Sequence, residues 1–240
     1  MVVVEFILEY GKIVLFCVNV AVFVFLIWST RKSVSSTSSS SVNDVLLLTA
    51  HPDDEVMFFA PLLRSLRGQN RSVTVLCLSR GNTEREKEFL RSCADLGVQG
   101  NLDSFEDGFQ HCWDPEKVAN AIVKCASKMR LRTLVTFDQF GVSGHPNHIA
   151  CWRGAVQWAQ GKKEVSVLFL HSVSLWRKYL GLFEAIATIV MGGASPFFLS
   201  WDPFLVWKLM KNYPTQNVWY RKLYGLFSRY VYINTLVKNK

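Results

Sequence analysis

The feature that most constrains the fold is a repeated alternation of short apolar runs with longer amphipathic stretches. Apolar runs of strand length occur at residues 45–49, 73–78, 134–137 and 165–170, with a weaker one at 98–102. Continuous apolar runs suit parallel strands that are covered on both faces. The sequence therefore predicts an α/β domain with a Rossmann-like, doubly wound, mostly parallel sheet.

Helical patterns connect these runs. Residues 55–66 place their apolar side chains on one face, and residues 83–96 form a second helix with Thr83 as N-cap and Gly97 just beyond its end. A third helix, 114–128, begins with Asp114 as its cap. A fourth runs to about residue 160, with Pro146 predicted at its first position and His145 as its N-cap.

Three polar clusters follow the predicted strands at their carboxyl ends. His51 to Asp54 follow the first strand, Asp138 follows the strand at 134–137, and His145 and His148 open the next helix. In a doubly wound sheet the ligand site lies outside these strand ends. Three of the five histidines of the chain fall in these clusters, so we expect a functional site there.

The residue types suit a metal. A hydrolytic zinc site uses three ligands drawn from His and carboxylate and keeps one position open for water. His51, one of the two adjacent aspartates, and one of the two later histidines could supply such a set. The alternative is structural, because Asp53 and Asp54 could cap a helix and His145-Pro146 could form a turn.

The two motifs also carry a resemblance. Ala50-His51-Pro52-Asp53-Asp54-Glu55, with Gly144-His145-Pro146-Asn147-His148 downstream, resembles the LmbE-type N-acetylglucosaminyl deacetylase family. The resemblance extends over about residues 44–236. It implies His51, Asp54 and His148 as zinc ligands (another divalent metal is an alternative), Asp53 as general base, and protonated His145 as the group that stabilises the oxyanion.

Further residues have weaker assignments. Arg85 and Asp107 are candidates for substrate binding. Asp138 is a candidate to orient a ligand histidine, or else to cap the next turn. The chain departs from the family pattern in two places: Asn147 stands where Asp is frequent, and the loop after Asn82 is short.

Phe137-Asp138, Gly141-Val142-Ser143-Gly144-His145 and the tail from Trp219 to Asn234 resemble the branch of the family that acts on N-acetylglucosaminyl-phosphatidylinositol in the biosynthesis of glycosylphosphatidylinositol anchors. This resemblance implies hydrolysis of the N-acetyl group, with the glycolipid and the membrane as partners. Two alternatives are a deacetylase of another N-acetylglucosamine conjugate and a weakly active homologue that binds the glycolipid or a partner enzyme.

The N-terminus predicts a membrane anchor at residues 1–32, because residues 13–28 carry no charge and Arg31 and Lys32 follow them. A cleaved signal peptide fits less well, since Glu5 and Glu9 precede the run. The positive-inside rule places the rest of the chain in the cytoplasm. The family implies the endoplasmic reticulum membrane. None of the six cysteines forms a Cys-x-x-Cys pair, which is typical of free thiols in a reducing compartment.

The remaining chain divides into a Ser-rich linker at 33–43, the catalytic domain at 44–171, and an aromatic and basic region at 172–240 that completes the domain near the membrane. Within it, residues 185–199 carry no charge and predict a membrane-dipping or interfacial segment, with a buried core helix as the alternative. The net charge of +8 comes from scattered residues rather than one basic stripe, so we expect no nucleic-acid partner.

Overall fold

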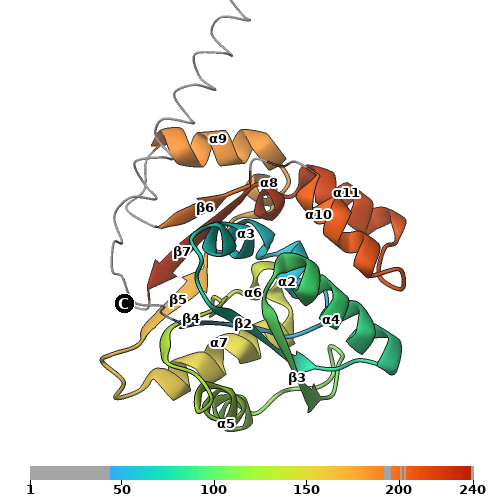
Figure 1. Ribbon diagram of the computed structural model, residues 1–240. Helices are drawn as coiled ribbons and strands as arrows, with labels where there is room; N and C mark the ends of the chain where they lie inside the picture. Colours follow the sequence, from blue (N-terminus) through green and yellow to red (C-terminus); the bar gives the residue numbers. More distant parts are fainter. Residues whose placement is uncertain (1–43, 192–195, 201, 203, 239–240) are drawn as a thin grey trace, which may run out of the picture.

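The computed structural model describes residues 44–191, 196–200, 202 and 204–238. Its strands form one sheet in the order β3-β2-β1-β4-β5-β7-β6 (Figure 1). The first five strands are parallel, while β7 runs antiparallel to both β5 and β6. The strands are β1 (Asp44–Thr49), β2 (Val73–Ser79), β3 (Gln99–Phe105), β4 (Leu131–Phe137), β5 (Ser166–Leu170), β6 (Phe197–Leu199) and β7 (Ile233–Lys238). The predicted α/β class with a mostly parallel sheet is confirmed.

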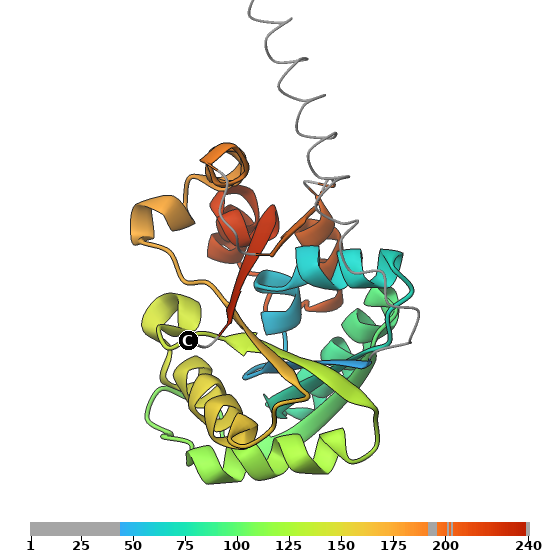
Figure 2. The ribbon, with the colours of Figure 1, turned by 90° about the vertical axis from the view of Figure 1, so that its left-hand side faces the viewer.

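Helices cover both faces of the sheet. In Figures 1 and 2, α5 and α7 lie together at the bottom, and the elements after β5 gather at the top. The helices before β5 are α2 (Asp54–Met57), α3 (Ala60–Gly68), α4 (Thr83–Leu96), α5 (Pro115–Ala126), α6 (Gly141–Gly144) and α7 (Pro146–Ala159). Those after it are α8 (Leu175–Lys178), α9 (Gly181–Met191), α10 (Leu205–Leu209), η2 (Met210–Asn212), α11 (Trp219–Phe227) and η3 (Arg229–Val231).

The core is centred on β1, which has β2 and β4 as neighbours. Leu46, Leu47 and Leu48 of this strand have no exposed surface, because helices cover both sides of the sheet. This double coverage explains why the strand is apolar at every position rather than at alternate ones.

The helix predicted at 55–66 is divided into α2 and α3, and its continuity was wrong. Pro61 has no N–H group and its ring would collide with a carbonyl four residues earlier, so the helix breaks before it. Side chains from the end of the chain satisfy the freed backbone groups. The Asn234 amide accepts from the Leu62 N–H at 3.0 Å and donates to the Phe58 carbonyl at 2.8 Å, and the Tyr224 hydroxyl donates to the Met57 carbonyl at 3.1 Å.

The predicted helix ends are largely confirmed. Asp114 caps α5, His145 caps α7 with Pro146 at its first position, and Gly97 ends α4 with a positive φ of 67°. One cap was wrong: Asn82, rather than Thr83, accepts a hydrogen bond from a backbone N–H of α4. The side-chain oxygen of Asn82 accepts a hydrogen bond from the Arg85 N–H at 2.9 Å. The capping residue of α4 is therefore one position earlier than expected.

The membrane predictions concern two segments. The anchor at 1–32 and the linker at 33–43 lie outside the described residues. Among the described residues, no helix has the length and apolar character needed to cross a bilayer. The interfacial segment predicted at 185–199 includes most of α9 and all of β6, together with residues 192–195, which are not described.

Candidate active site

The candidate site lies outside the carboxyl ends of β1 and β4, where the order of strands reverses. The chain runs outward from β1 through β2 to β3, and then returns to β4 on the other side of β1. The crevice at such a switch point is the usual ligand site of open α/β sheets. The turns after these two strands supply His51, Asp53, Asp54, His145 and His148, as the sequence predicts.

Asp54 fixes the turn after β1. Its Oδ2 accepts hydrogen bonds from the backbone N–H groups of Ala50, at 3.0 Å, and His51, at 2.8 Å. Its Oδ1 lies 3.3 Å from Nε2 of His148. Burial raises the pKa of this carboxyl, but the neighbouring His148 and His51 outweigh burial and hold the pKa below its usual range. Asp54 is therefore an ionised carboxylate inside the protein that faces an imidazole.

The ring of His148 is held on two sides. It stacks on Phe137 at the end of β4, with 3.9 Å between ring centroids and 1° between planes. Its Nδ1 lies 3.1 Å from the carbonyl oxygen of Gly141, a contact that keeps the proton on Nδ1. Nε2 is buried and makes no hydrogen bond with any described residue. It lies beside the Asp54 carboxylate, and in the ring protonated on Nδ1 its lone pair would be available to a cation held between the two groups.

The turn after β4 has an unusual backbone. Gly141, Val142 and Gly144 all have positive φ, at 57°, 62° and 74°. For a β-branched residue such as Val142 this conformation is strained, and strain of this kind persists only where the surroundings impose it. The N–H of Val142 donates to the Ser172 hydroxyl at 2.8 Å. The result is that the Gly141 carbonyl meets His148.

The donor atoms suit a divalent cation. One donor atom each from His51, His145 and His148 lies within 4.8 Å of the others. The predicted set shares His51 and His148 with this cluster and takes Asp54 in place of His145. The buried Nε2 atom of His148, without a hydrogen-bond partner and 3.3 Å from the Asp54 carboxylate, is the observation that supports the fit. The choice of Asp54 as third ligand stays a prediction.

Asp107 and Arg85 meet beside His51. Asp107 Oδ1 lies 3.1 Å from Nε2 of His51, and its Oδ2 accepts from Arg85 Nη1 at 2.8 Å. Arg85 also donates to the Pro52 carbonyl at 3.0 Å. The hydrogen bond from His51, and then the charges around it, lower the pKa of Asp107 to about 2. Both residues are placed at the site, where they hold the His51 ring and the turn after β1.

The charge of His51 depends on these carboxylates. Burial lowers the pKa of His51, but Asp107 and Asp54 outweigh burial and raise it to about 9. The side chain of Asn147 also contacts His51, because its amide nitrogen lies 3.1 Å from Nε2 of the ring. A carboxylate that holds one nitrogen of a metal-binding imidazole orients the ring and increases its basicity.

His145 differs from its predicted form. Burial, and then the two neighbouring imidazoles, lower its pKa to about 4, so the ring is neutral rather than protonated. Its Nδ1 accepts the backbone N–H of Asn147 at 3.2 Å. In the neutral ring the proton therefore sits on Nε2, which can still donate a hydrogen bond to an oxyanion. Phe109 covers the ring, with 4.2 Å between centroids.

Asp53 is the buried acid predicted as general base. Its φ is 104°, a positive value that residues other than glycine rarely adopt. Its carboxylate pairs with the guanidinium of Arg221 on α11. Arg221 lies 168 positions further along the chain, and the sequence indicated only that it belonged to a basic, aromatic cluster.

Glu55 is a second residue whose place the sequence did not reveal. It has no exposed surface, accepts from the hydroxyls of Tyr213 and Ser92 at 2.5 and 2.7 Å, and accepts from the Asp53 N–H at 3.1 Å. Burial raises its pKa to about 7. Glu55 therefore joins the turn after β1 to α4 and to the segment before α11.

Asp138 caps a turn, and the direct contact with a ligand histidine was wrong. Its carboxylate accepts from the Phe140 N–H at 3.1 Å and from the backbone and side chain of Ser172 at 2.7 and 2.5 Å. The Gly141 carbonyl has taken the position beside His148. Asp138 acts on that carbonyl only through the turn that it stabilises.

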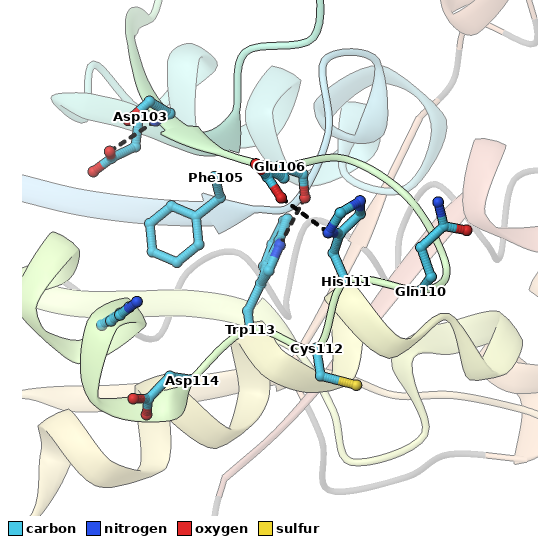
Figure 3. A pocket seen from close by; sticks show the side chains of 10 residues that line it. Asp103, Phe105, Glu106, Gln110, His111, Cys112, Trp113 and Asp114 are labelled. Atoms are coloured by element: carbon cyan, nitrogen blue, oxygen red, sulfur yellow. Dashed lines mark hydrogen bonds and ion pairs between the residues drawn. The ribbon is translucent and has the colours of Figure 1, made fainter.

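The loop between β3 and α5 approaches the site through Trp113, and Figure 3 shows the side chains of this loop. The ring of Trp113 lies 6.0 Å from the ring of His51, and its indole N–H donates to the Glu106 carbonyl at 2.8 Å. The Glu106 carboxylate lies 3.0 Å from Nδ1 of His111. These side chains line a cavity of 590 Å³. His111 thus belongs to the loop and lies outside the metal-binding cluster.

Comparisons with known proteins identify relatives over most of the chain. A family model described as GlcNAc-PI de-N-acetylase matches residues 46–159. The N-acetylglucosaminyl-phosphatidylinositol de-N-acetylase of Bos taurus is 36% identical over 246 residues, covering 92% of this chain and 96% of the relative. A probable enzyme of the same name from Schizosaccharomyces pombe is 34% identical, covering 87% and 92%.

Solved structures support the fold. A deacetylase of the teicoplanin biosynthetic pathway, crystallised as a triple mutant, has a TM-score of 0.58 at 16% identity and covers 82% of this chain and 99% of its own. The two curated relatives match over nearly their whole length, and the matched family region contains both motifs. The chain therefore belongs to the N-acetylglucosaminyl-phosphatidylinositol de-N-acetylase family.

Proposed function

We propose that the chain hydrolyses the N-acetyl group of N-acetylglucosaminyl-phosphatidylinositol in glycosylphosphatidylinositol-anchor biosynthesis. The products are acetate and a glucosaminyl lipid with a free amine. The observation that carries this proposal is the meeting of Asp53, Asp54 and His148 at the switch point of the sheet, with His148 Nε2 3.3 Å from Asp54. The names of the curated relatives support the choice of substrate.

His51, Asp54 and His148 would hold the metal, which we propose is zinc. When bound, such a cation polarises the amide carbonyl and lowers the pKa of an adjacent water towards ~7. The protein supplies two ring nitrogens and one carboxylate, and it fixes the rings through Asp107 and the Gly141 carbonyl.

Asp53 acts as the base in this proposal. It accepts a proton from the attacking water as the oxygen bonds to the amide carbon, and it returns that proton to the nitrogen as the C–N bond breaks. The paired Arg221 fixes the direction of the carboxylate.

His145 faces the same space and donates from Nε2 to the oxygen that gains negative charge in the tetrahedral transition state. A neutral imidazole can do this, since Nδ1 is occupied as an acceptor for the Asn147 N–H. His145 therefore stabilises the oxyanion without first taking a proton from solution.

We further propose that residues 1–32 anchor the chain in the endoplasmic reticulum membrane, with the catalytic domain in the cytoplasm. The free thiols at Cys77, Cys93, Cys112, Cys125 and Cys151 support a reducing compartment. Protection of the catalytic domain from protease added outside sealed microsomes would contradict this orientation.

The test of the proposed function follows acetate release from acetyl-labelled N-acetylglucosaminyl-phosphatidylinositol by membranes that carry the full chain. We expect release that stops with a metal chelator and returns when zinc is added. Release that chelation leaves unchanged would remove the metal from the account. Binding of substrate without any release would favour a glycolipid-binding role.

A further inference from the structure

A cavity of 350 Å³ lies beside the candidate site, between α8 and α11. Its apolar wall comes from Met57 and Phe58, next to the catalytic turn, and from Leu223 and Phe227 of α11. Two cations, Lys178 and Arg221, also line it. Among the described residues, the lining thus combines an apolar wall with two positive charges and contains no acidic side chain.

Lys178 is the unusual member. Only 6% of it is exposed, and no carboxylate of a described residue lies within salt-bridge distance. Its Nζ has a long contact of 3.5 Å to the Val142 carbonyl and lies 5.6 Å from the ring centre of Tyr179. Burial lowers its pKa. A buried ammonium group without a counter-charge is costly, and an anion in the cavity would supply that charge.

Arg221 connects the cavity to the chemistry. Its guanidinium lines the cavity and also pairs with Asp53, the acid proposed as general base. A ligand held by the two cations would therefore lie next to the catalytic turn.

The helices around the cavity bury an acidic side chain and expose large apolar ones, which is the reverse of a normal protein surface in water. On α9, Glu184 is only 4% exposed and is bound by Arg177, while Phe183 and Met191 are 79% and 82% exposed. Trp176 of α8 and Trp219 of α11 are 83% and 72% exposed. A helix in water normally turns its acid outward and its apolar side inward, so this arrangement is that of a surface in contact with lipid.

These helices share one side of the molecule. Both ribbon views place α8, α9 and α11 at the top, away from α5 and α7 at the bottom (Figures 1 and 2). Exposed tryptophans with Lys and Arg nearby suit the headgroup level of a membrane better than a protein partner, because rings and cations both find partners there.

We propose that this cavity binds the phosphodiester of a glycerophospholipid through Lys178 and Arg221, while the acyl chains pass over α8, α9 and α11 into the bilayer. The inference rests on the proposed function, since it assigns the lipid-phosphate end of that substrate. It also makes Lys178 a residue that distinguishes lipid-linked sugars from soluble ones.

The first test compares two substrates with the full chain in phosphatidylcholine vesicles. One is N-acetylglucosaminyl-phosphatidylinositol, and the other is N-acetylglucosaminyl-inositol, which lacks phosphate and acyl chains. Lys178→Met should raise the KM for the lipid about tenfold more than the KM for the soluble compound, because one charge-assisted hydrogen bond is lost. Lys178→Arg should restore most of the difference, and Lys124→Met, an exposed lysine of α5, should change neither KM.

An equal loss on both substrates for Lys178→Met would overturn the proposal, because Lys178 would then only support the Val142 turn. If the wild-type chain releases acetate from neither substrate, the proposed function fails and a second measurement decides on the cavity. This measurement uses phosphatidylinositol with a photoreactive acyl chain in the same vesicles.

Cross-links should fall within residues 175–191 and 219–227 and should decrease several-fold in Lys178→Met but not in Lys124→Met. Cross-links confined to other segments would contradict the proposal. Complete displacement of the probe by inorganic phosphate would show a site for a free anion, and dependence on an added protein would show a protein surface. Either outcome would also overturn it.

Discussion

The turns after β1 and β4 differ from the region that follows β5 in how they contribute to the same site. The two turns and the helix starts that follow them carry the acids and imidazoles, from His51 just after β1 to His148 in the first turn of α7. The later region carries Tyr213, Arg221 and Asn234, which contact Glu55, Asp53 and the break between α2 and α3. The reacting groups are thus encoded locally, and their support comes from distant parts of the chain.

This difference predicts two kinds of defect. Changes in the turns should remove turnover or metal and leave the fold intact. Changes in the later region, apart from Arg221, which pairs with Asp53, should lower stability or affinity for the lipid and leave the chemistry in place. Each prediction below tests one side of this division.

The largest effect is expected for Asp53→Asn. The amide cannot accept the proton of the attacking water, so turnover should fall by about two or more orders of magnitude. Metal content should stay near wild type, because Asp54 and the two histidines remain. Turnover at the normal rate would remove Asp53 from its role.

Asn234→Ala tests the role of the region after β5 in stability. It leaves the Leu62 N–H and the Phe58 carbonyl buried without their partner, which should cost about 2–4 kcal/mol of unfolding free energy. Denaturant titration measures this loss, and Asn120→Ala on the exposed face of α5 is the matched control. A loss of turnover at full stability would place Asn234 in the catalytic machinery and break the division.

Asp107→Asn should weaken metal affinity or activity about 10- to 100-fold, because it loses the charge that orients and polarises the His51 ring. Metal titration of the purified chain measures this effect. The control is Asp103→Asn, in β3 four positions before Asp107, which should leave the metal affinity unchanged. If both variants bind metal as the wild type does, Asp107 has no part in holding His51.

The smallest effect concerns pH. The pKa of Glu55 rises from 4.5 in the unfolded chain to about 7 on burial, so the folded state holds a proton that the unfolded state loses. This contribution is complete below about pH 4.5 and is lost as the pH rises through 7. Glu55→Gln should flatten the corresponding fall in stability, by about 1–3 kcal/mol over that window. An unchanged pH profile would show that Glu55 is ionised throughout.

Much of the local structure was predictable, because it depends on nearest neighbours along the chain. The apolar runs gave β1, β2, β4 and β5, and Asp114, His145 and Gly97 mark helix ends as expected. The meeting of the two motifs followed from the rule that parallel strands share one carboxyl edge.

The contacts of Asp53 and Glu55 could not be predicted in the same way. Arg221 and Tyr213 lie more than a hundred positions away, and no local period or spacing connects them to the first motif. Asp138 was ambiguous for a different reason: an acid after a strand can bind a side chain or cap a turn, and the Ser172 hydroxyl decided the outcome.

The most direct test of the central claim is the anomalous scattering of crystals of the zinc-loaded chain, measured at the zinc edge. We expect one ion outside the carboxyl ends of β1 and β4, bound by His51, Asp54 and His148, with His145 close by but unbound. An ion bound by His51, His145 and His148, with Asp54 outside its coordination shell, would contradict the assigned ligands. An ion located away from both turns would contradict the site itself.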